Sequence, residues 1–377
     1  MPARDAPQLA GLIEEAQRVL AICNACRYCE GYCAVFPALE RRLAFDEGDD
    51  HYLANLCHNC GSCLYACQYA PPHEFQLNFP RVLAQVRKET YRKYAWPAFL
   101  GAAFERNGLV AAIATVAGMA LLFMLMAADT ARLFTAYSDA QGAFYALMPH
   151  GEMAGLFGAV SLFVLLALAM SFARFWSDTG ERVTEFVASP ALSSATWDAA
   201  GLRYLDGGGD GCTYPDEKPS FARRRFHHFT FYGFMLCFAA TTVGTIYHYV
   251  FGIRAPYPFW SLPVILGTLG GLGLIVGPLG LLWLRHVRDP DLGDRTQTGM
   301  DVAFIALLLI TSVTGLALLA LRETRGMGVA LAIHLGAVLA LFVTLPYGKF
   351  VHALYRFAAL VRFHLERRRP LPQIGTE

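Results

Sequence analysis

Residues 23–33 read CNACRYCEGYC and residues 57–67 read CHNCGSCLYAC, so one spacing of four cysteines occurs twice. The spacing C-x-x-C-x-x-C-x-x-x-C is that of bacterial ferredoxins with two clusters, in which the fourth cysteine ligates the other cluster. The pattern therefore predicts two [4Fe–4S] clusters, crossed ligation and a chemistry of electron transfer. The predicted ligand sets are Cys23, Cys26, Cys29 and Cys67 for one cluster, and Cys57, Cys60, Cys63 and Cys33 for the other.

Two other uses of these cysteines fit the pattern less well. A disulfide framework is typical of small secreted domains, whereas this chain has 377 residues and no signal-peptide pattern in its first twenty. Structural zinc sites use cysteine pairs set well apart, whereas here three cysteines fall within seven residues, twice. Of the two cysteines outside the motifs, Cys237 is predicted to be a buried packing residue, and no role is assigned to Cys212.

The sequence beyond residue 108 is strongly apolar. Hydrophobic residues make up 55% of the chain, charged residues 16%, and the mean hydropathy is +0.37. Six stretches each approach the length of about 20 apolar residues that crosses a bilayer core, and six in succession argue against an ordinary soluble core. The stretches are Leu109–Ala128, Ala154–Ala173, Phe229–Phe251, Leu262–Leu284, Val302–Leu321 and Gly328–Tyr347.

Lysine and arginine are concentrated on one side of these stretches. With the cysteine motifs inside, the inner segments carry 22 Lys and Arg and the outer segments carry 4. Positively charged loops stay in the cytoplasm, so the cysteine motifs and both ends of the chain are predicted to be cytoplasmic. The inner segments are 81–108, 174–228, 285–301 and 348–377, and the outer ones are 129–153, 252–261 and 322–327.

The predicted fold is all-α, with a helical two-[4Fe–4S] ferredoxin-like domain at residues 1–78 and a six-helix transmembrane bundle at residues 109–365. Residues 79–108 begin with FPRVLAQVRKETYRKYAW, whose apolar and basic residues at helical spacing predict an interfacial amphipathic linker helix. The polar, Gly/Pro-rich loop at residues 174–226 is predicted to lie at the cytoplasmic face, against the clusters or a partner, with a flexible tether as the alternative. Residues 366–377 are the C-terminal tail.

Five histidines near the ends of the third and sixth stretches are predicted cofactor ligands. Ionisable residues inside a membrane are functional candidates, and two histidines at matching depth suit the axial positions of haem b. Because the two stretches run antiparallel, depth pairs His248 with His334 on the outer side, and His352 with His227 or His228 on the inner side. Helical register favours His227 over His228, and one or two haems b are predicted.

Other features point to packing and not to catalysis. Glycines in the fourth stretch predict close helix contacts, since no strand precedes them to form a dinucleotide site. The sequence contains no flavin fingerprint, nucleotide-binding loop or catalytic triad, so no substrate-converting site and no nucleic-acid partner are predicted. The glycines are Gly267, Gly270, Gly271, Gly273 and Gly277, and the histidines expected to be ordinary interfacial residues are His150, His286 and His364.

Four segments carry a resemblance to a known family. They read CNACRYCEGYCAVFP, LCHNCGSCLYACQYAPPHEFQLNFPRVLAQVRKETY, RYLDGGGDGCTYPDE and HHFTFYGFMLCFAATT. Together they resemble the tricarballylate/citrate utilisation protein B family (TcuB/CitB, the B-half of CobZ), from about Cys23 to the last apolar stretch. The first domain also resembles the helical ferredoxin of succinate dehydrogenase iron–sulfur subunits and heterodisulfide reductase C subunits.

The resemblance implies an electron carrier of the bacterial inner membrane with iron–sulfur clusters and haem b. Its partner would be an FAD-dependent dehydrogenase that oxidises tricarballylate, citrate or a related polycarboxylate, and its acceptor would be the membrane quinone pool. The eight motif cysteines carry over as cluster ligands, and the depth-matched histidines carry over as haem candidates.

Two other functions fit parts of the pattern. One is the anchor subunit of another membrane reductase, of the heterodisulfide or nitrate-reductase gamma type, with a different soluble partner. The other is a membrane redox sensor, which would hold clusters without haem and would not reduce quinone.

Overall fold

The computed structural model describes residues 6–127, 130–137, 142–188 and 190–370. Within these ranges the chain forms helices and no β-strand, and an isolated bridge joins Cys212 to Ser220, so the all-α prediction is confirmed. The α-helices are α1 (Ala6–Cys26), α2 (Val35–Leu39), α3 (Glu47–Leu56), α4 (Ser62–Tyr65), α5 (Phe79–Tyr94), α6 (Asn107–Met126), α7 (Thr130–Leu133), α8 (Ala143–Leu147), α9 (His150–Asp178), α10 (Val183–Ala188), α11 (Pro190–Ala200), α12 (Ala222–Tyr249), α13 (Leu262–His286), α14 (Thr298–Leu321), α15 (Met327–Thr344) and α16 (Val351–Glu366). Short 3-10 helices are η1 (Ala98–Phe104), η3 (Pro290–Leu292), η4 (Arg295–Gln297) and η5 (Leu345–Tyr347).

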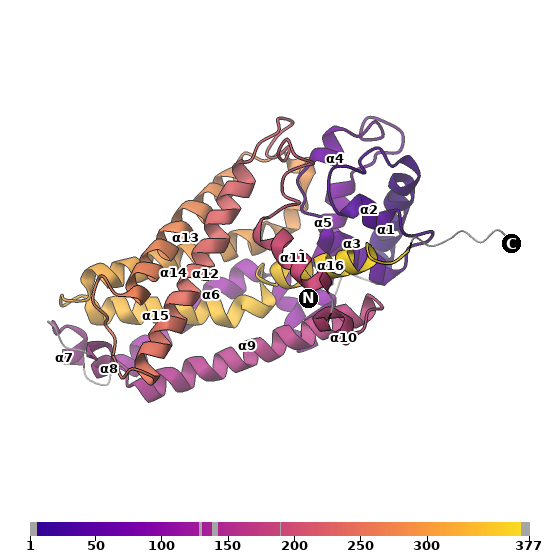
Figure 1. Cartoon of the computed structure of the whole chain (residues 1–377). Helices are drawn as coiled ribbons and strands as arrows, with labels where there is room; N and C mark the ends of the chain where they lie inside the picture. The colour runs from indigo at the N-terminus through magenta and orange to yellow at the C-terminus, as the bar shows by residue number, and fades with distance from the viewer. Residues whose placement is uncertain (1–5, 128–129, 138–141, 189, 371–377) are drawn as a thin grey trace.

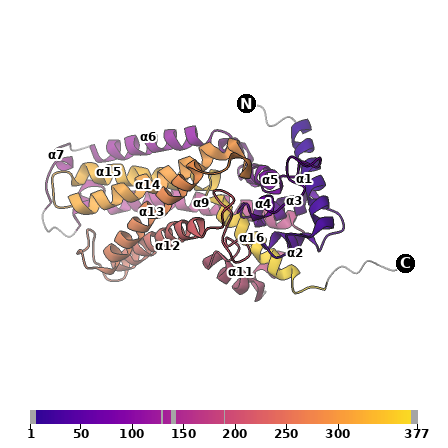
Figure 2. The same cartoon turned by 90° about the horizontal axis from the view of Figure 1, so that it is seen from above.

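Helices α1–α5 gather at one end of the molecule, and the apolar helices of the bundle extend away from them (Figures 1 and 2). In the described ranges, six helices are long and apolar enough to cross a membrane, and each overlaps one predicted stretch. The predicted six-helix architecture is thereby confirmed, and it is consistent with a multi-pass membrane protein. The six segments are Asn107–Met126, His150–Asp178, Ala222–Tyr249, Leu262–His286, Arg295–Leu321 and Met327–Tyr347.

One hydrophobic core joins the cysteine-bearing helices to the bundle. Tyr91 of α5 stacks on Tyr355 of α16, with ring centres 5.8 Å apart, and Phe175 of α9 packs against the same Tyr355 at 5.1 Å. All three rings are buried in one cluster that also includes Tyr52 of α3. Because α16 returns from the bundle across α3, the position of the first domain is set by the last helix of the chain.

Helix α5 forms the first part of the segment at residues 79–108, which is predicted to be an interfacial linker helix. It starts at Asn78, whose side chain accepts a hydrogen bond from the backbone N–H of Arg81 at 3.1 Å, a standard helix cap. Most of its side chains are buried, including Arg87 at 5% exposure, and it packs against α1 and α3. The apolar face of α5 therefore packs in the protein core. A helix on a protein core and a helix on a membrane surface show the same spacing of apolar residues.

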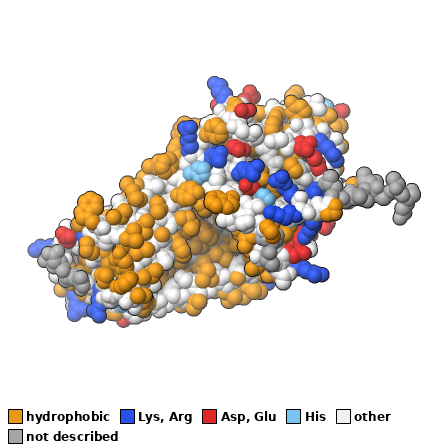
Figure 3. All heavy atoms as spheres, in the orientation of Figure 1, with side chains coloured by type: hydrophobic (Ala, Val, Ile, Leu, Met, Phe, Trp, Pro, Cys, Tyr) orange, Lys and Arg blue, Asp and Glu red, His pale blue; other side chains and the backbone are white. Residues whose placement is uncertain are grey.

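Helices α12 and α13 form a tight pair with little cover on the remaining sides of α12. A Cβ on Gly270 would lie 2.8 Å from the carbonyl oxygen of Gly233, so glycine allows this close approach, as the packing interpretation requires. Only 6% of the apolar window of α12 is buried, against 61% for the last of the six segments. Figure 3 shows a recess lined by hydrophobic side chains between α12 and α9.

Candidate functional site

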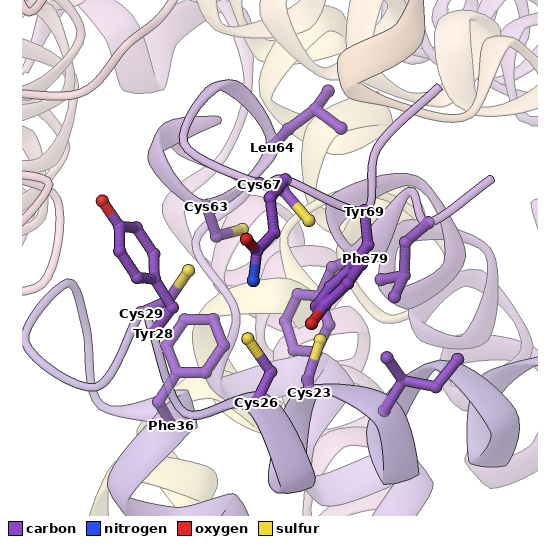
Figure 4. Close-up of a pocket in the computed structure, with 13 residues that line it drawn as sticks. Cys23, Cys26, Tyr28, Cys29, Phe36, Cys63, Leu64, Cys67, Tyr69 and Phe79 are labelled. Carbon is purple, nitrogen blue, oxygen red and sulfur yellow. The ribbon is translucent and has the colours of Figure 1, made fainter. Parts of the chain in front are cut away.

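The end of α1 and the turn after it place the first cysteine motif around a pocket. Cys23 and Cys26 lie in the last turn of α1, and Cys29 follows it. Cys63 and Cys67 of the second motif line the same pocket, and Figure 4 shows the five sulfur atoms turned toward a common space. The aromatic residues that line it are Tyr28, Phe36, Tyr69 and Phe79.

An adjoining pocket contains the other thiols. It shares Phe36, Phe79 and Cys63 with the first pocket, so the two are direct neighbours. Cys33, from the first motif, lines only this second pocket, whereas Cys67, from the second motif, lines only the first. The thiols are therefore grouped as the crossed arrangement predicts, with Cys63 at the border. The cysteines of the second pocket are Cys33, Cys57, Cys60 and Cys63.

The chemistry of these thiols suits iron–sulfur clusters better than single ions. In the part of the chain that the structure describes, no three Cys, His, Asp or Glu side chains converge closely enough to hold one metal ion. A cubane does not need such convergence, because its four thiolates bind different iron atoms. Burial, followed by the neighbouring thiols, raises the pKa of Cys23 and of Cys63, so bound iron is needed to offset the charge of the thiolates.

The two pockets differ in their access to solvent. Tyr28, at the rim of the first pocket, is 68% exposed, and Arg27 beside it is also exposed. In the second pocket, Cys57 and Cys60 are only 6% and 8% exposed. Cys60 packs in one apolar cluster with Leu284 of α13. The first pocket therefore faces solvent and the second faces the bundle.

Residues 201–221 form a loop that packs against the second cysteine motif. Gly61, with φ of +86°, lies so close to the loop that a Cβ would stand 2.6 Å from the carbonyl oxygen of Thr213. Gly207, with φ of +62°, would place a Cβ 2.1 Å from the carbonyl oxygen of Gly211. Only glycine tolerates these conformations and contacts. The loop thus lies against the second motif, as one of the two alternatives for this segment anticipated.

The loop brings Cys212 against a predicted cluster ligand. Cys212 is fully buried, and its sulfur lies 3.4 Å from the carbonyl oxygen of Leu205. The neighbouring Cys212 thiol is the main reason that the pKa of Cys60 is lowered. The sequence showed no role for Cys212, although the glycine-rich run before it was a usable signal of a loop packed against another backbone.

We expect Cys212→Ala to lower the midpoint potential of the second cluster. The substitution removes a thiol donor from the neighbourhood of the Cys60 sulfur, and hydrogen bonds to the sulfurs are among the factors that set cluster potentials. A redox titration followed by EPR measures the change. Cys237→Ala is the matched control, because Cys237 packs against Gly270 in the bundle; equal potentials in the two variants would contradict the prediction.

Two of the candidate histidines meet at the inner end of the bundle. The rings of His227 on α12 and His352 on α16 have centres 6.2 Å apart and planes at 81°. Nδ1 of His352 donates to the carbonyl oxygen of Lys349 at 2.5 Å, which leaves Nε2 free for a ligand, and Nδ1 of His227 is buried without a hydrogen-bond partner. Burial, followed by the charge of Arg356, holds the pKa of His352 well below its usual value, so the ring is neutral, as a metal ligand must be.

His228 lies on a different side of α12. Its ring is beside that of Tyr232, with centres 5.7 Å apart, and it lines a groove between α12 and α13. Successive residues of a helix point about 100° apart, since one turn takes 3.6 residues. Of the two neighbouring histidines, the structure brings His227 to His352, in agreement with the helical register.

The outer histidines have separate neighbours. His248 stacks on His150 at the start of α9, with ring centres 3.8 Å apart and planes at 7°, and its Nδ1 lies 3.4 Å from the hydroxyl of Tyr145. Nδ1 of His334 on α15 lies 3.1 Å from the hydroxyl of Thr314 on α14. The sequence did not predict the contact of His248 with His150, because only histidines of the third and sixth apolar stretches were paired by their depth in the membrane.

Comparison with known proteins gives a consistent result along the chain. The family model described as citrate utilization protein B Fer4-like domain matches residues 16–93, and the model described as citrate utilization protein B matches residues 103–373. The chain is 53% identical over 359 residues to citrate utilization protein B of Escherichia coli, which covers 94% of this chain and 93% of that protein. No solved structure matches the chain.

Proposed function

Because the chain belongs to the citrate utilization protein B family, we propose that it is the membrane electron-transfer subunit of a tricarballylate- or citrate-type dehydrogenase system. An iron–sulfur electron-transfer role fits its ferredoxin-like domain. Electrons enter from the reduced FAD of a soluble flavoprotein dehydrogenase and leave to quinone in the bilayer. The chain itself converts no organic substrate, so its activity depends on the flavoprotein partner.

The grouping of eight thiols into two adjoining pockets is the observation that carries this proposal. The first pocket, held by Cys23, Cys26, Cys29 and Cys67, faces solvent, where a soluble donor has access. The second, held by Cys33, Cys57, Cys60 and Cys63, lies beside the bundle. Two [4Fe–4S] clusters in this order supply one-electron steps that divide the electron pair of a reduced flavin.

The surface of the first pocket supports entry of electrons there. Tyr28 and Arg27 are exposed at its rim, and aromatic and arginine side chains are enriched in protein interfaces. We assign this rim to the flavoprotein. The excess of 22 over 4 Lys and Arg supports a cytoplasmic position for this rim and for both ends of the chain, at the bacterial inner membrane.

The inner histidine pair supports a haem b between α12 and α16. His227 and His352 would hold the haem, because two neutral imidazoles satisfy a b-type iron. The rings of His227 and His352 are 6.2 Å apart. Helix α12 is thinly covered by the rest of the chain, and Figure 3 shows a recess on one side of it. When bound, the haem supplies a further one-electron centre inside the membrane.

A second haem is proposed for the outer half of the bundle. His248 and His334 are the candidate ligands there, with His228 as the alternative to His227 at the inner site. Each outer histidine has one ring nitrogen close to a hydroxyl group, from Tyr145 or Thr314. Such contacts orient an imidazole and leave the other ring nitrogen for a metal.

The experiment that tests the proposal is a pair of spectra of the full chain in membranes or detergent. Reduction by dithionite should reveal b-type haem bands in the optical spectrum and two magnetically coupled clusters in the EPR spectrum. Addition of the reduced flavoprotein and a quinone should then reoxidise these centres. Clusters without haem would favour a redox sensor, and the absence of clusters would overturn the whole proposal.

We expect His352→Ala to remove the inner haem and to leave both clusters intact. The substitution deletes one of the two histidines that would hold the haem, whereas the Cys pockets keep all their thiols. Haem content and the cluster EPR signals are measured in the same preparation. His286→Ala is the matched control, because His286 is exposed at the end of α13; unchanged haem in His352→Ala would contradict the assignment.

A further inference from the structure

Three arginines lie between the second cysteine motif and the inner histidines. Arg87 donates to the carbonyl oxygens of Ala54 and Cys57, both at 2.8 Å. Arg356 donates to the same oxygen of Cys57 at 3.0 Å, and Arg223 donates to the carbonyl oxygen of Asn59 at 2.8 Å. The cations therefore border the cluster-binding backbone on the side of the bundle.

Arg223 and Arg356 also lie one helical turn from the two inner histidines. Arg223 precedes His227 by four residues on α12, and Arg356 follows His352 by four residues on α16. Residues four apart lie on the same face of a helix. Each helix thus presents a histidine and an arginine in line, with the arginine on the side of the second motif.

These arginines have no carboxylate partner among the described residues, although Arg223 lies over the ring of Tyr214 at 4.6 Å. Among the described residues, no carboxylate forms an ion pair with Arg87, Arg223 or Arg356, and Nε of Arg356 is buried without a hydrogen-bond partner. A guanidinium that is buried without an opposite charge is unfavourable. Elsewhere the chain supplies acids: Arg42 pairs with Glu366, Arg362 with Asp49, and both Arg285 and Lys349 with Asp301.

Because no carboxylate side chain among the described residues pairs with these arginines, we infer that a bound anion supplies the negative charge. The guanidinium of Arg87 donates to the backbone oxygens of Ala54 and Cys57, beside the proposed second cluster. Arg223 and Arg356 instead retain donors next to a pair of rings that suits haem, and haem b carries two carboxylates on one edge. Guanidinium groups bind carboxylates through paired, charge-assisted hydrogen bonds.

We propose that Arg223 and Arg356 bind the propionate carboxylates of the haem held by His227 and His352. The inference rests on the proposed function, since it requires that haem. It orients the cofactor, with its anionic edge toward the backbone of Cys57 and Asn59 and therefore toward the second cluster. The two arginines are positioning residues that join the haem edge to the cluster loop.

The test uses full-length Arg223→Gln, Arg356→Gln and the double variant. We expect each single variant to lose about tenfold in haem affinity, as outer-shell substitutions at metal sites do, and the double variant to lose more. The haem that remains should have a lower midpoint potential, because nearby cations favour the reduced, more negative state. Haem per chain, the haem potential and the EPR of both clusters are measured together.

Two further variants make the result specific. Arg225→Gln, on the same helix but exposed, should leave haem content and potential unchanged. Arg356→Lys keeps the charge and should retain more haem than Arg356→Gln, which a purely structural role would not require. Unaltered cluster signals in the glutamine variants show that the chain is folded.

Three outcomes would overturn the inference. If wild-type protein holds haem and the double variant holds as much at the same potential, the arginines do not bind the propionates. If only the potential of the second cluster shifts, they serve the cluster and not the haem. If wild-type protein and His352→Ala are alike in lacking haem, the haem part of the proposed function itself fails, and this inference fails with it.

Discussion

Cys67→Ala is expected to remove the cluster held with the first motif and to leave the other cluster in place. Cys67 belongs to the second motif in the sequence, yet it lines the pocket of Cys23, Cys26 and Cys29. A cubane that loses one of four thiolate ligands has an open iron and is readily lost. We therefore expect about half of the iron to be lost and the coupled EPR signal to become that of a single cluster.

Cys33→Ala is the reciprocal variant. Cys33 belongs to the first motif but lines the second pocket, so its removal should abolish the buried cluster next to the bundle. The two remaining clusters differ in exposure, and a soluble oxidant should react faster with the one that survives in Cys33→Ala. If each substitution instead removed the cluster of its own motif, crossed ligation would be wrong. Cys63 is unsuitable for this comparison, because it borders both pockets.

Glu366→Ala is expected to destabilise the packing of α16 against the first domain by about 1.5–3 kcal/mol, the contribution of a hydrogen bond to a charged group, because Arg42 and Arg362 both keep Asp49 as a partner. Glu366, at the end of α16, is 7% exposed and lies 2.5 Å from Nη2 of Arg42. Its carboxylate also accepts a hydrogen bond from the hydroxyl of Tyr52 at 3.0 Å and lies 3.1 Å from Nε of Arg362. The substitution leaves both arginines without this carboxylate.

The measurement is thermal unfolding of the detergent-solubilised chain, followed by the visible absorbance of the clusters. Glu323→Ala is the matched control, since Glu323 is 57% exposed and lies 3.6 Å from Arg322. An exposed pair contributes about 0–1 kcal/mol, so this variant should unfold near the wild-type temperature. Equal unfolding temperatures in the two variants would show that α16 does not anchor the first domain through Glu366.

The contacts of Glu366 with the first domain also explain why the last helix matters for electron transfer. Helix α16 carries Glu366 at one end, which contacts the first domain, and His352 near the other end, which faces His227. Arg356 between them contacts the backbone of Cys57. Loss of the ion pairs at Glu366 should therefore disturb the spacing between the second pocket and the histidines as well as stability.

Much of the architecture was predictable from local patterns. The double cysteine spacing predicted eight cluster ligands in crossed sets, and the structure groups the same thiols in two adjoining pockets. The apolar stretches identified the spans, because bilayer thickness sets their length. The glycines of the fourth stretch predicted close packing, and Gly270 against Gly233 shows it.

Other features of the structure could not be predicted from short stretches of the sequence. Helix α5 has the periodicity of an interfacial helix, but periodicity reports only that one face is apolar and not whether lipid or protein covers it. Cys212 lies 145 residues beyond Cys67, and only the path of the loop brings it to Cys60. His248 and His334 match in depth, but depth leaves the rotation of each helix undetermined, and their rings contact different helices.

The sequence by itself determined the chemistry of the donors, the number of spans and the side of the membrane predicted for the clusters, because spacing, segment length and loop charge act over a few residues. Tertiary structure alone decided that Cys212 lies beside Cys60, that His248 stacks on His150, and that Arg223 and Arg356 lie beside the second motif without a carboxylate partner among the described residues. These relations depend on how α12 and α16 are rotated and on where the loop at residues 201–221 packs. Contacts between residues far apart in the chain set those features, and no run of adjacent residues records them.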